Sequence, residues 1–203
     1  METETHGKFF VWWDDISETD WENYRNALES ANREQDMQNY LEQNPNILVH
    51  TVGGGHGRWV IPQFQLGSNY VADFVVGEKH SFGHEWLLVE LKSPKAKMFT
   101  KKGDPTAQLT HAIRQIQDWR AWIRKNLGYV GRKTVDNGLG LIDIHDSTYG
   151  LILIGRDTDN DEKNNERRRQ MYIENRLRIH TYDFLLRVGS NVDIIKFIKD
   201  ESV

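Results

Sequence analysis

The stretch YVADFVVGEKHSFGHEWLLVELKSP, residues 70–94, holds two apolar segments that are each interrupted by charge. Asp73 lies inside the first segment, VADFVV (71–76), and Glu90 and Lys92 lie inside the second, LLVELK (87–92). Both segments predict buried strands, and the turn-forming residues between them predict a hairpin-like connection over 77–85. An unpaired carboxylate in a buried strand costs several kcal/mol, so the three charges must be explained together.

The alternation of side chains along a strand brings these charges to one place. Residues i and i+2 point to the same face, so Glu90 and Lys92 project from one side of their strand. Neighbouring strands bring facing side chains within about 5 Å of each other, which places Asp73 beside that pair. Two carboxylates that converge in a semi-apolar cleft repel each other unless a cation lies between them.

A divalent cation with oxygen ligands would relieve that repulsion. Mg²⁺ typically binds one or two carboxylates and keeps water and phosphate oxygens as further ligands. The pattern therefore predicts a Mg²⁺ site at Asp73 and Glu90, with Lys92 orienting or deprotonating a water, or stabilising charge on a phosphate. This arrangement is typical of metal-assisted phosphodiester hydrolysis. The alternative is a structural ion-pair cluster, in which Asp73 pairs with Lys92 and Glu90 lies at a solvent edge.

The composition excludes several classes of protein. The 203 residues include no cysteine, which excludes a disulfide framework and a cysteine-ligated zinc site and indicates a reducing compartment. No apolar run approaches the ~20 residues of a membrane span and no charged-then-apolar signal opens the chain, so we expect a cytoplasmic protein without a membrane partner. The net charge of −4 argues against a passive nucleic-acid coat, but not against an enzyme that contacts nucleic acid locally.

The order of elements predicts an α/β domain with a mixed β-sheet flanked by helices. Helices are expected from Asn32 to Pro45, over 105–127 and over about 160–178. Strands are expected over 46–52, 58–66, 70–77, 85–92, 149–156 and 177–186. We expect an N-terminal extension over 1–30 and one domain over 31–203. The aromatic segment FFVWW (9–13) predicts a short strand or cap over the core, with a partner-binding patch as the alternative.

Polar residues on the helix over 105–127 are candidate supports for the site. Gln108, His111 and Gln115 fall at i, i+3 and i+7, so they share one helix face. Such a stripe beside a catalytic strand can hold a water, a phosphate or a metal ligand, and Gln115 is the favoured member. The alternative is a solvated helix face, which is the preferred interpretation for His111 taken alone.

Two further groups of charged residues are candidates on the same argument. Glu34, in the first predicted helix, can reach the metal from the opposite side, although surface glutamates are common. The loop after Lys92 is rich in lysines that can contact backbone phosphates without reading sequence, the alternative being a merely soluble loop. These lysines are Lys95, Lys97, Lys101 and Lys102.

Several of these segments together resemble a known family. The segments are EQDMQNYLEQNP (34–45), the strand with Asp73, VELKSP (89–94), a glutamine-bearing helix, LILIGRD (151–157) and IHTYDFLL (179–186). They resemble the PD-(D/E)XK nuclease superfamily and, more narrowly, the nuclease domain of Shedu anti-phage defence proteins, over roughly residues 30–190.

The resemblance implies a restriction-endonuclease-like fold and a metal-dependent endonuclease that cuts invading phage or plasmid DNA. It implies Mg²⁺ as the cofactor, with Mn²⁺ as a substitute, and Asp73 and Glu90 as metal ligands. It gives Lys92 the position of the catalytic lysine, Gln115 that of the helix glutamine and Glu34 that of the first-helix acid. We also expect a homo-oligomer, because cutting both strands of a duplex usually takes two active sites.

The sequence departs from the family pattern in two places. No proline precedes Asp73, and only about thirty residues precede the region of resemblance, where Shedu proteins often carry a further regulatory domain. The alternative function is a non-catalytic nucleic-acid-binding or scaffold protein on the same fold.

Overall fold

A five-stranded mixed sheet forms the centre of the computed structural model, which describes residues 6–12, 16–52, 57–157 and 162–188. The strands β1 (Gly57–Leu66), β2 (Tyr70–His80), β3 (Gly83–Leu91), β4 (Tyr149–Leu153) and β5 (Leu177–His180) lie side by side in chain order. β1, β2 and β3 form an antiparallel meander, whereas β4 and β5 run parallel to β3. This arrangement confirms the prediction of an α/β domain with a mixed sheet and is compatible with a restriction-endonuclease-like fold.

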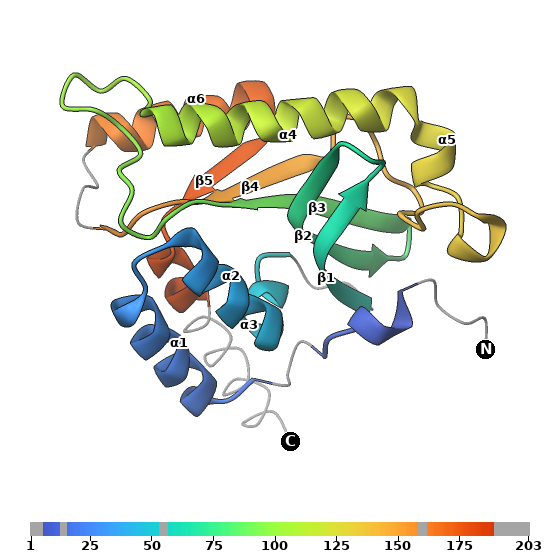
Figure 1. Ribbon diagram of the computed structural model, residues 1–203, viewed down its shortest axis with the longest axis horizontal. Helices are drawn as coiled ribbons and strands as arrows, with labels where there is room; N and C mark the ends of the chain where they lie inside the picture. The colour runs from blue at the N-terminus through green and yellow to red at the C-terminus, as the bar shows by residue number, and fades with distance from the viewer. Residues whose placement is uncertain (1–5, 13–15, 53–56, 158–161, 189–203) are drawn as a thin grey trace.

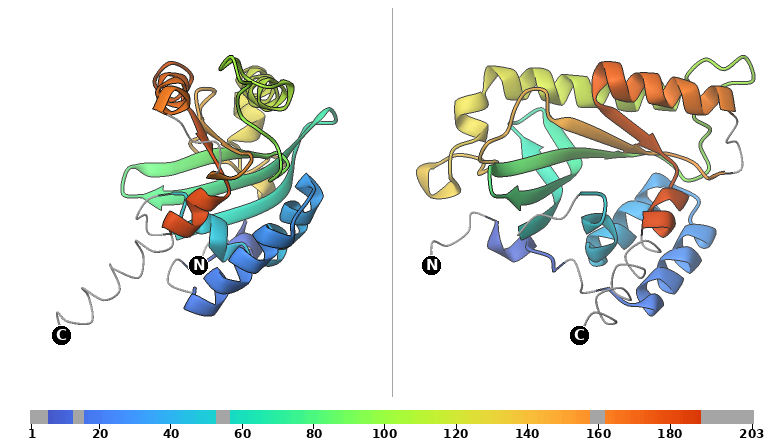
Figure 2. Two further views of the ribbon diagram at one scale, coloured as in Figure 1. Left: turned by 90° about the vertical axis from the view of Figure 1, so that its left-hand side faces the viewer. Right: turned by 180° about the vertical axis from the view of Figure 1, so that it is seen from behind.

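Helices cover both faces of the sheet (Figures 1 and 2). On one face lie α1 (Glu18–Ser30), α2 (Glu34–Gln43) and α3 (Asn46–Val49); on the other lie α4 (Ala107–Lys125) and α6 (Glu162–Asn175). Two apolar cores result, because alternate strand residues point to opposite faces. The short elements are α5 (Leu127–Val130) and the 3₁₀ helices η1 (Gly7–Phe9) and η2 (Thr134–Asp136). No helix in the described ranges is both long and apolar enough to span a membrane.

Helix α1 was not expected from the sequence, and its start is fixed by a capping box. The Ser17 hydroxyl accepts a hydrogen bond from the backbone N–H of Asp20, and the Asp20 carboxylate accepts one from the backbone N–H of Ser17. Trp21, Tyr24 and Leu28 follow at helical spacing and are buried in the core on the α1–α3 side of the sheet. The acidic residues between them conceal this apolar stripe in the sequence.

Two predicted strands are wrong in part. Residues 46–52 were expected to form a strand, but 46–49 form α3, in which Ile47, Leu48 and Val49 are all buried. A short run that is apolar on every side fits a buried helical turn as well as a strand, so its pattern cannot separate the two. The strand expected over 177–186 ends at His180, and residues 183–188 are helical.

The connection expected over 77–85 is also mostly strand, because β2 and β3 continue to a tight turn at Ser81 and Phe82. Gly77 makes this continuation possible. A Cβ atom at Gly77 would lie 2.4 Å from Cζ3 of Trp86, its partner on β3, so the ring occupies the space that a side chain would fill.

The aromatic N-terminal segment packs against β1. Phe10 forms an isolated bridge with Trp59, and their ring centroids are 5.8 Å apart. The backbone N–H of Val11 donates to the carbonyl of Arg58 at 3.0 Å. Trp12 is 64% exposed, and Trp13 lies outside the described residues. Phe9 and Phe10 thus cover one end of the core on the α4 side.

Candidate active site

Asp73 and Glu90 occupy facing positions on β2 and β3. The antiparallel register pairs Phe74 with Val89, so the next step along the two strands brings Asp73 opposite Glu90. An Asp73 carboxylate oxygen accepts a hydrogen bond from the backbone N–H of Leu91 at 2.8 Å. That bond fixes the Asp73 side chain against the end of β3, and Glu90 is 1% exposed beside it.

Lys92 joins the carboxylates of two elements. Its Nζ lies 2.5 Å from Oε1 of Glu90 and 3.5 Å from Oε2 of Glu34, the first residue of α2. The Lys92 backbone is held on both sides, since its N–H donates to the carbonyl of Leu153 and its carbonyl accepts from the hydroxyl of Tyr182, both at 2.8 Å. The contact between Glu90 and Lys92 was predicted, because residues i and i+2 of a strand point to the same face. The contact of Lys92 with Glu34 brings a third acid to the same place.

The start of α2 explains how Glu34 comes to the site. One oxygen of Asp36 accepts hydrogen bonds from the backbone N–H groups of Asn32 and Arg33, at 3.0 and 2.9 Å. These bonds, together with the Arg33 guanidinium, lower the pKa of Asp36 to about 2. The charged carboxylate therefore stabilises the N-terminus of the helix at neutral pH, and Glu34 is its first residue.

The cluster brings three carboxyl groups, those of Asp73, Glu90 and Glu34, close to the ammonium group of Lys92. Burial, and then the neighbouring Asp73 charge, raise the pKa of Glu90 to about 8, despite the opposing effect of Lys92. Burial also raises the pKa of Asp73, and the hydrogen bond from Leu91 counters it. Burial lowers the pKa of Lys92, but Glu90 outweighs it and the net shift is upward. The site thus holds a fixed ammonium and more carboxylate than that ammonium can compensate.

Two residues near this cluster were missed in the sequence. Gln38 lies one helical turn beyond Glu34, and its Nε2 is 3.5 Å from the carbonyl of Asp73. Its Oε1 is buried and has no hydrogen-bond partner within the part of the chain that the structure describes. Its i+4 relation to Glu34 was the available signal. Tyr182 holds the carbonyl of Lys92 from 90 residues further along the chain, and no local pattern could have indicated that bond.

Gln115 lies on the helix that covers the Glu90 face of the sheet. Its neighbour Ile116 packs in the same core as Leu88, which shares a strand face with Glu90. The Oε1 atom of Gln115 is buried and has no hydrogen-bond partner among the described residues. A role for Gln115 at the site stays a prediction. Gln108 and His111 are exposed on α4 and stay predictions as well.

The lysine-rich loop begins directly after Lys92 and runs to α4 as a long excursion (Figure 1). It is anchored by the buried Phe99, which bridges to Pro105, and by the Thr106 hydroxyl, which donates to the carbonyl of Lys97 at 2.7 Å. Four lysines of the loop are exposed, and phosphate contact by them remains a prediction; they are Lys95, Lys97, Lys101 and Lys102.

The fold and the site together define an α/β domain of restriction-endonuclease-like type, with facing carboxylates and a lysine at the end of the central strand. Residues 31–186 match the sequence model of the family described as Shedu protein SduA, C-terminal. The chain therefore belongs to the Shedu family, which confirms the narrower resemblance and implies a role in anti-phage defence. A search of curated proteins finds no match.

Proposed function

We propose that this protein is a metal-dependent DNA endonuclease that hydrolyses phosphodiester bonds of invading DNA in anti-phage defence. The observation that carries the proposal is the meeting of Asp73, Glu90 and Lys92 at the end of β3, with Lys92 Nζ 2.5 Å from Glu90. Membership of the Shedu family supports the same conclusion.

The donor set fits a hard divalent cation. Asp73 and Glu90 offer carboxylate oxygens. Full ionisation of the pair is opposed by burial, which raises the pKa of both groups, and by the Asp73 charge, which raises the pKa of Glu90 further. Asp73 and Glu90 would hold Mg²⁺ or Mn²⁺, with Glu34 as a further acid. When bound, the ion would supply Lewis-acid stabilisation of a phosphoryl oxygen and ease the deprotonation of a water.

The chain's own groups have distinct tasks. The N–H of Leu91 keeps Asp73 aimed toward Glu90, and Tyr182 keeps the backbone of Lys92 in place. The ion pairs of Lys92 with Glu90 and Glu34 favour its ammonium form. Of the two roles considered for Lys92, the stabilisation of negative charge on the phosphate therefore fits better than the removal of a proton from water.

The test is incubation of the purified protein with linear and supercoiled DNA, in Mg²⁺, in Mn²⁺ and in chelator. We expect cleavage with either metal, none with chelator, and none from Asp73→Asn. Asp118→Asn, an exposed aspartate on α4, is the matched control and should cut like the parent protein. DNA binding without cleavage under every metal condition would favour the non-catalytic alternative.

The proposal extends to a homo-oligomer that presents two sites to the two strands of a duplex. Light scattering coupled to size exclusion should give a mass of at least twice the 23.8 kDa of one chain. A monomer that only nicks supercoiled DNA would contradict this extension and leave the nuclease assignment in place.

A further inference from the structure

Gln38 is a buried polar residue on α2, the helix that packs against β3 beside the candidate active site. It is 5% exposed, and the other buried residues of α2, Met37 and Leu41, are apolar. Its carboxamide oxygen, Oε1, is buried and accepts no hydrogen bond from the residues that the structure describes. A buried acceptor without a donor is unfavourable, so native proteins keep one mainly where a water, an ion or a catalytic role accounts for it.

The nitrogen of the Gln38 carboxamide fixes the orientation of the group. Nε2 donates to Oε1 of Glu42 at 2.6 Å and lies 3.5 Å from the carbonyl oxygen of Asp73. Exchanging the oxygen and nitrogen of the amide would bring three acceptors together. The atom that lacks a partner among the described residues is therefore the oxygen.

This oxygen lies at the edge of the candidate active site. The oxygen and nitrogen of an amide are about 2.3 Å apart, so Oε1 lies within about 6 Å of the Asp73 carbonyl oxygen. Glu34 precedes Gln38 by one turn on the same face of α2, and its Oε2 lies 3.5 Å from Nζ of Lys92. Gln38 thus lies between the acid that pairs with Lys92 and the acid that faces Glu90.

The acids around Gln38 do not supply the missing donor. Glu34 and Glu42 lie one turn before and one turn after it on α2, and the main chain of Asp73 contacts it from β2. Ionised carboxylates accept hydrogen bonds and donate none. A water held by a cation directs its hydrogens away from the cation, toward acceptors, and Mg²⁺ usually keeps several such waters.

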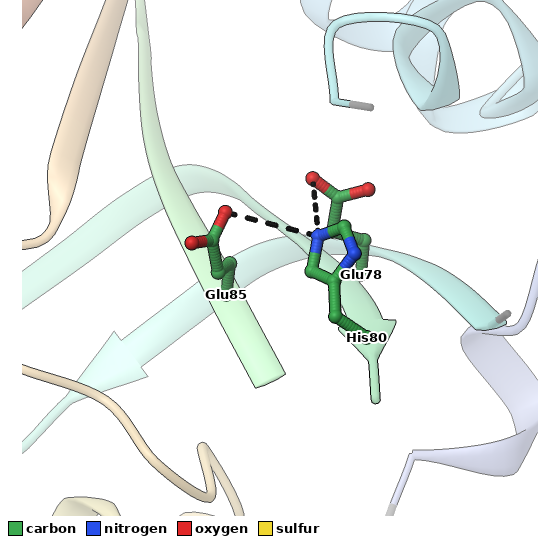
Figure 3. Close-up of side chains that lie close together, drawn as sticks. All are labelled: Glu78, His80 and Glu85. Carbon is green, nitrogen blue, oxygen red and sulfur yellow. Dashed lines mark ion pairs between the residues drawn. The ribbon is translucent and has the colours of Figure 1, made fainter. Parts of the chain in front are cut away.

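The acids at the turn of the β2–β3 hairpin provide a contrast. Glu78, His80 and Glu85 have side chains of types that bind metals, and their ligand atoms all lie within 4.8 Å of one another. The His80 ring lies between the two carboxylates (Figure 3), with Nε2 3.2 Å from Glu78 and 3.8 Å from Glu85. Those acids have a partner in the chain itself, whereas Oε1 of Gln38 has none within the described ranges.

We propose that Gln38 is a positioning residue of the candidate active site, whose Oε1 accepts a hydrogen bond from a water ligand of the divalent ion held by Asp73 and Glu90. The inference rests on the proposed metal-dependent function and adds to it a residue that the sequence did not indicate. Residues that hold the ligands of a metal from behind change its affinity by about 10–100-fold. Gln38 is buried, so it acts on the ion through that water and does not contact DNA.

The experiment measures Mn²⁺ binding without DNA, from the electron paramagnetic resonance signal of the unbound ion as it is titrated into chelator-treated protein. Two substitutions separate the roles of the two amide atoms, because Gln38→Met removes both and Gln38→Glu keeps an acceptor oxygen. We expect Gln38→Met to bind Mn²⁺ more than tenfold more weakly than the parent protein, and Gln38→Glu to bind it at least as tightly. The matched controls are Gln35→Met and Gln35→Glu, at an exposed glutamine of the same helix, and neither should weaken binding.

Stability in chelator separates this role from a structural one. Gln38→Met removes a buried acceptor that lacks a donor in the described structure, so its urea midpoint in chelator should equal or exceed that of the parent protein. The inference is overturned if Gln38→Met binds Mn²⁺ as the parent does, or if Gln38→Glu loses as much affinity as Gln38→Met. It is also overturned if the weaker binding of Gln38→Met comes with a lower urea midpoint.

Asp73→Asn in the same titration distinguishes the failure of this inference from the failure of the proposed function. If Asp73→Asn abolishes Mn²⁺ binding while Gln38→Met preserves it, only the role of Gln38 is wrong. If the parent protein binds no Mn²⁺, or Asp73→Asn binds it unchanged, the proposed metal site and the role of Gln38 are overturned together.

Discussion

Within the described ranges, the Asp73 carboxylate is held by a backbone hydrogen bond and forms no ion pair with a positively charged side chain. Its carboxylate accepts from the N–H of Leu91, whereas Lys92 Nζ pairs with Glu90 and Glu34. The structural ion-pair cluster considered from the sequence required Lys92 to pair with Asp73 and Glu90 to lie at a solvent edge. Glu90 is buried instead, so the charges crowd together at the end of β3.

This crowding predicts that Asp73→Asn abolishes activity without unfolding the protein. The amide oxygen of Asn can still accept from Leu91, and the loss of one negative charge relieves its repulsion with Glu90. We expect the free energy of unfolding, measured with urea in chelator, to be unchanged or higher, while cleavage falls below detection. Asp118→Asn serves as the control in both measurements. A large loss of stability in Asp73→Asn, together with no effect of metal on the parent protein, would restore the structural ion-pair interpretation.

A second prediction concerns Lys92, which is tested by substitution with Met. Met keeps the length and apolar stem of the side chain but removes the ammonium charge, which we propose stabilises negative charge on the phosphate. We expect kcat to fall by more than about a hundredfold, by analogy with the loss of one oxyanion donor, while the Mg²⁺ concentration for half-maximal activity changes little. Lys125→Met, at the end of α4, is the control. A large rise in the Mg²⁺ requirement with kcat preserved would instead show that Lys92 organises the metal ligands.

At the scale of residues, the alternation of side chains along a strand explains which parts of the site could be predicted from the sequence. The alternation of side chains places Glu90 and Lys92 on one face, and the hairpin brings Asp73 opposite. The contribution of Tyr182 could not be predicted, because its hydroxyl reaches Lys92 across 90 residues of sequence. Gln38 was missed although it lies at i+4 from Glu34, because polar residues at that spacing are common on amphipathic helices.

At the scale of elements, the β2–β3 hairpin depends on one glycine. The sequence places a glycine beside charged residues at 77–79, which is typical of a turn, yet β2 continues through it because the Trp86 ring fills the space above Gly77. Local turn signals were overridden by tertiary packing. Residues 46–49 and 183–186 were predicted to be strand but are helical, for the related reason that short, largely apolar runs carry no clear period.

We predict that Gly77→Ala destabilises the hairpin. The new Cβ would lie 2.4 Å from Trp86, in a core where displaced side chains cost about 1–3 kcal/mol. Gly128→Ala is the matched control, because a Cβ there meets nothing within 4 Å and alanine suits the short helix α5 better than glycine. Urea unfolding should show a loss for Gly77→Ala and none for Gly128→Ala. Equal stability of the two variants would mean that the Trp86 ring moves aside freely.

The junction of α6 and β5 predicts a dependence of stability on pH. Burial, and then the charges of Arg168, Arg178 and Arg187, lower the pKa of His180 to about 4, and Arg168 lies 3.0 Å from its Nδ1. His180 binds a proton near pH 6.5 in the unfolded chain but only near pH 4 in the folded chain. Stability should therefore fall as pH decreases from 6.5 to 4, by up to about 1.4 kcal/mol per unit from this group.

His180→Asn tests this dependence, because Asn keeps a hydrogen-bond acceptor near Arg168 and does not titrate. We expect a smaller slope of the free energy of unfolding against pH, measured with urea between pH 4 and 6.5. The decrease relative to the parent protein should correspond to about one bound proton, which is about 1.4 kcal/mol per pH unit. His111→Asn is the control and should keep the full slope. An unchanged slope in His180→Asn would show that His180 binds its proton equally in the folded and unfolded states.

At the scale of the whole molecule, the candidate site is joined to the helices on the α1 side of the sheet. The Tyr24 hydroxyl on α1 donates to the carbonyl of Tyr182 at 2.9 Å, and the Tyr182 hydroxyl donates to the carbonyl of Lys92 at 2.8 Å. Both tyrosines are fully buried. Tyr24, which lies in the expected N-terminal extension, thus helps to support the backbone of Lys92.

This chain of hydrogen bonds predicts that Tyr24→Phe affects both stability and activity. The substitution keeps the buried ring but removes one of the two donors to the Tyr182 carbonyl, which still accepts from the N–H of Leu185, so we expect a loss of about 0.5–1.5 kcal/mol. Because Tyr182 positions Lys92, we expect kcat to fall several-fold with little change in the Mg²⁺ requirement. Tyr172→Phe, at an exposed tyrosine on α6, should leave both the urea midpoint and cleavage unchanged. If Tyr24→Phe lowers stability while kcat is preserved, then α1 supports the fold but not the position of Lys92.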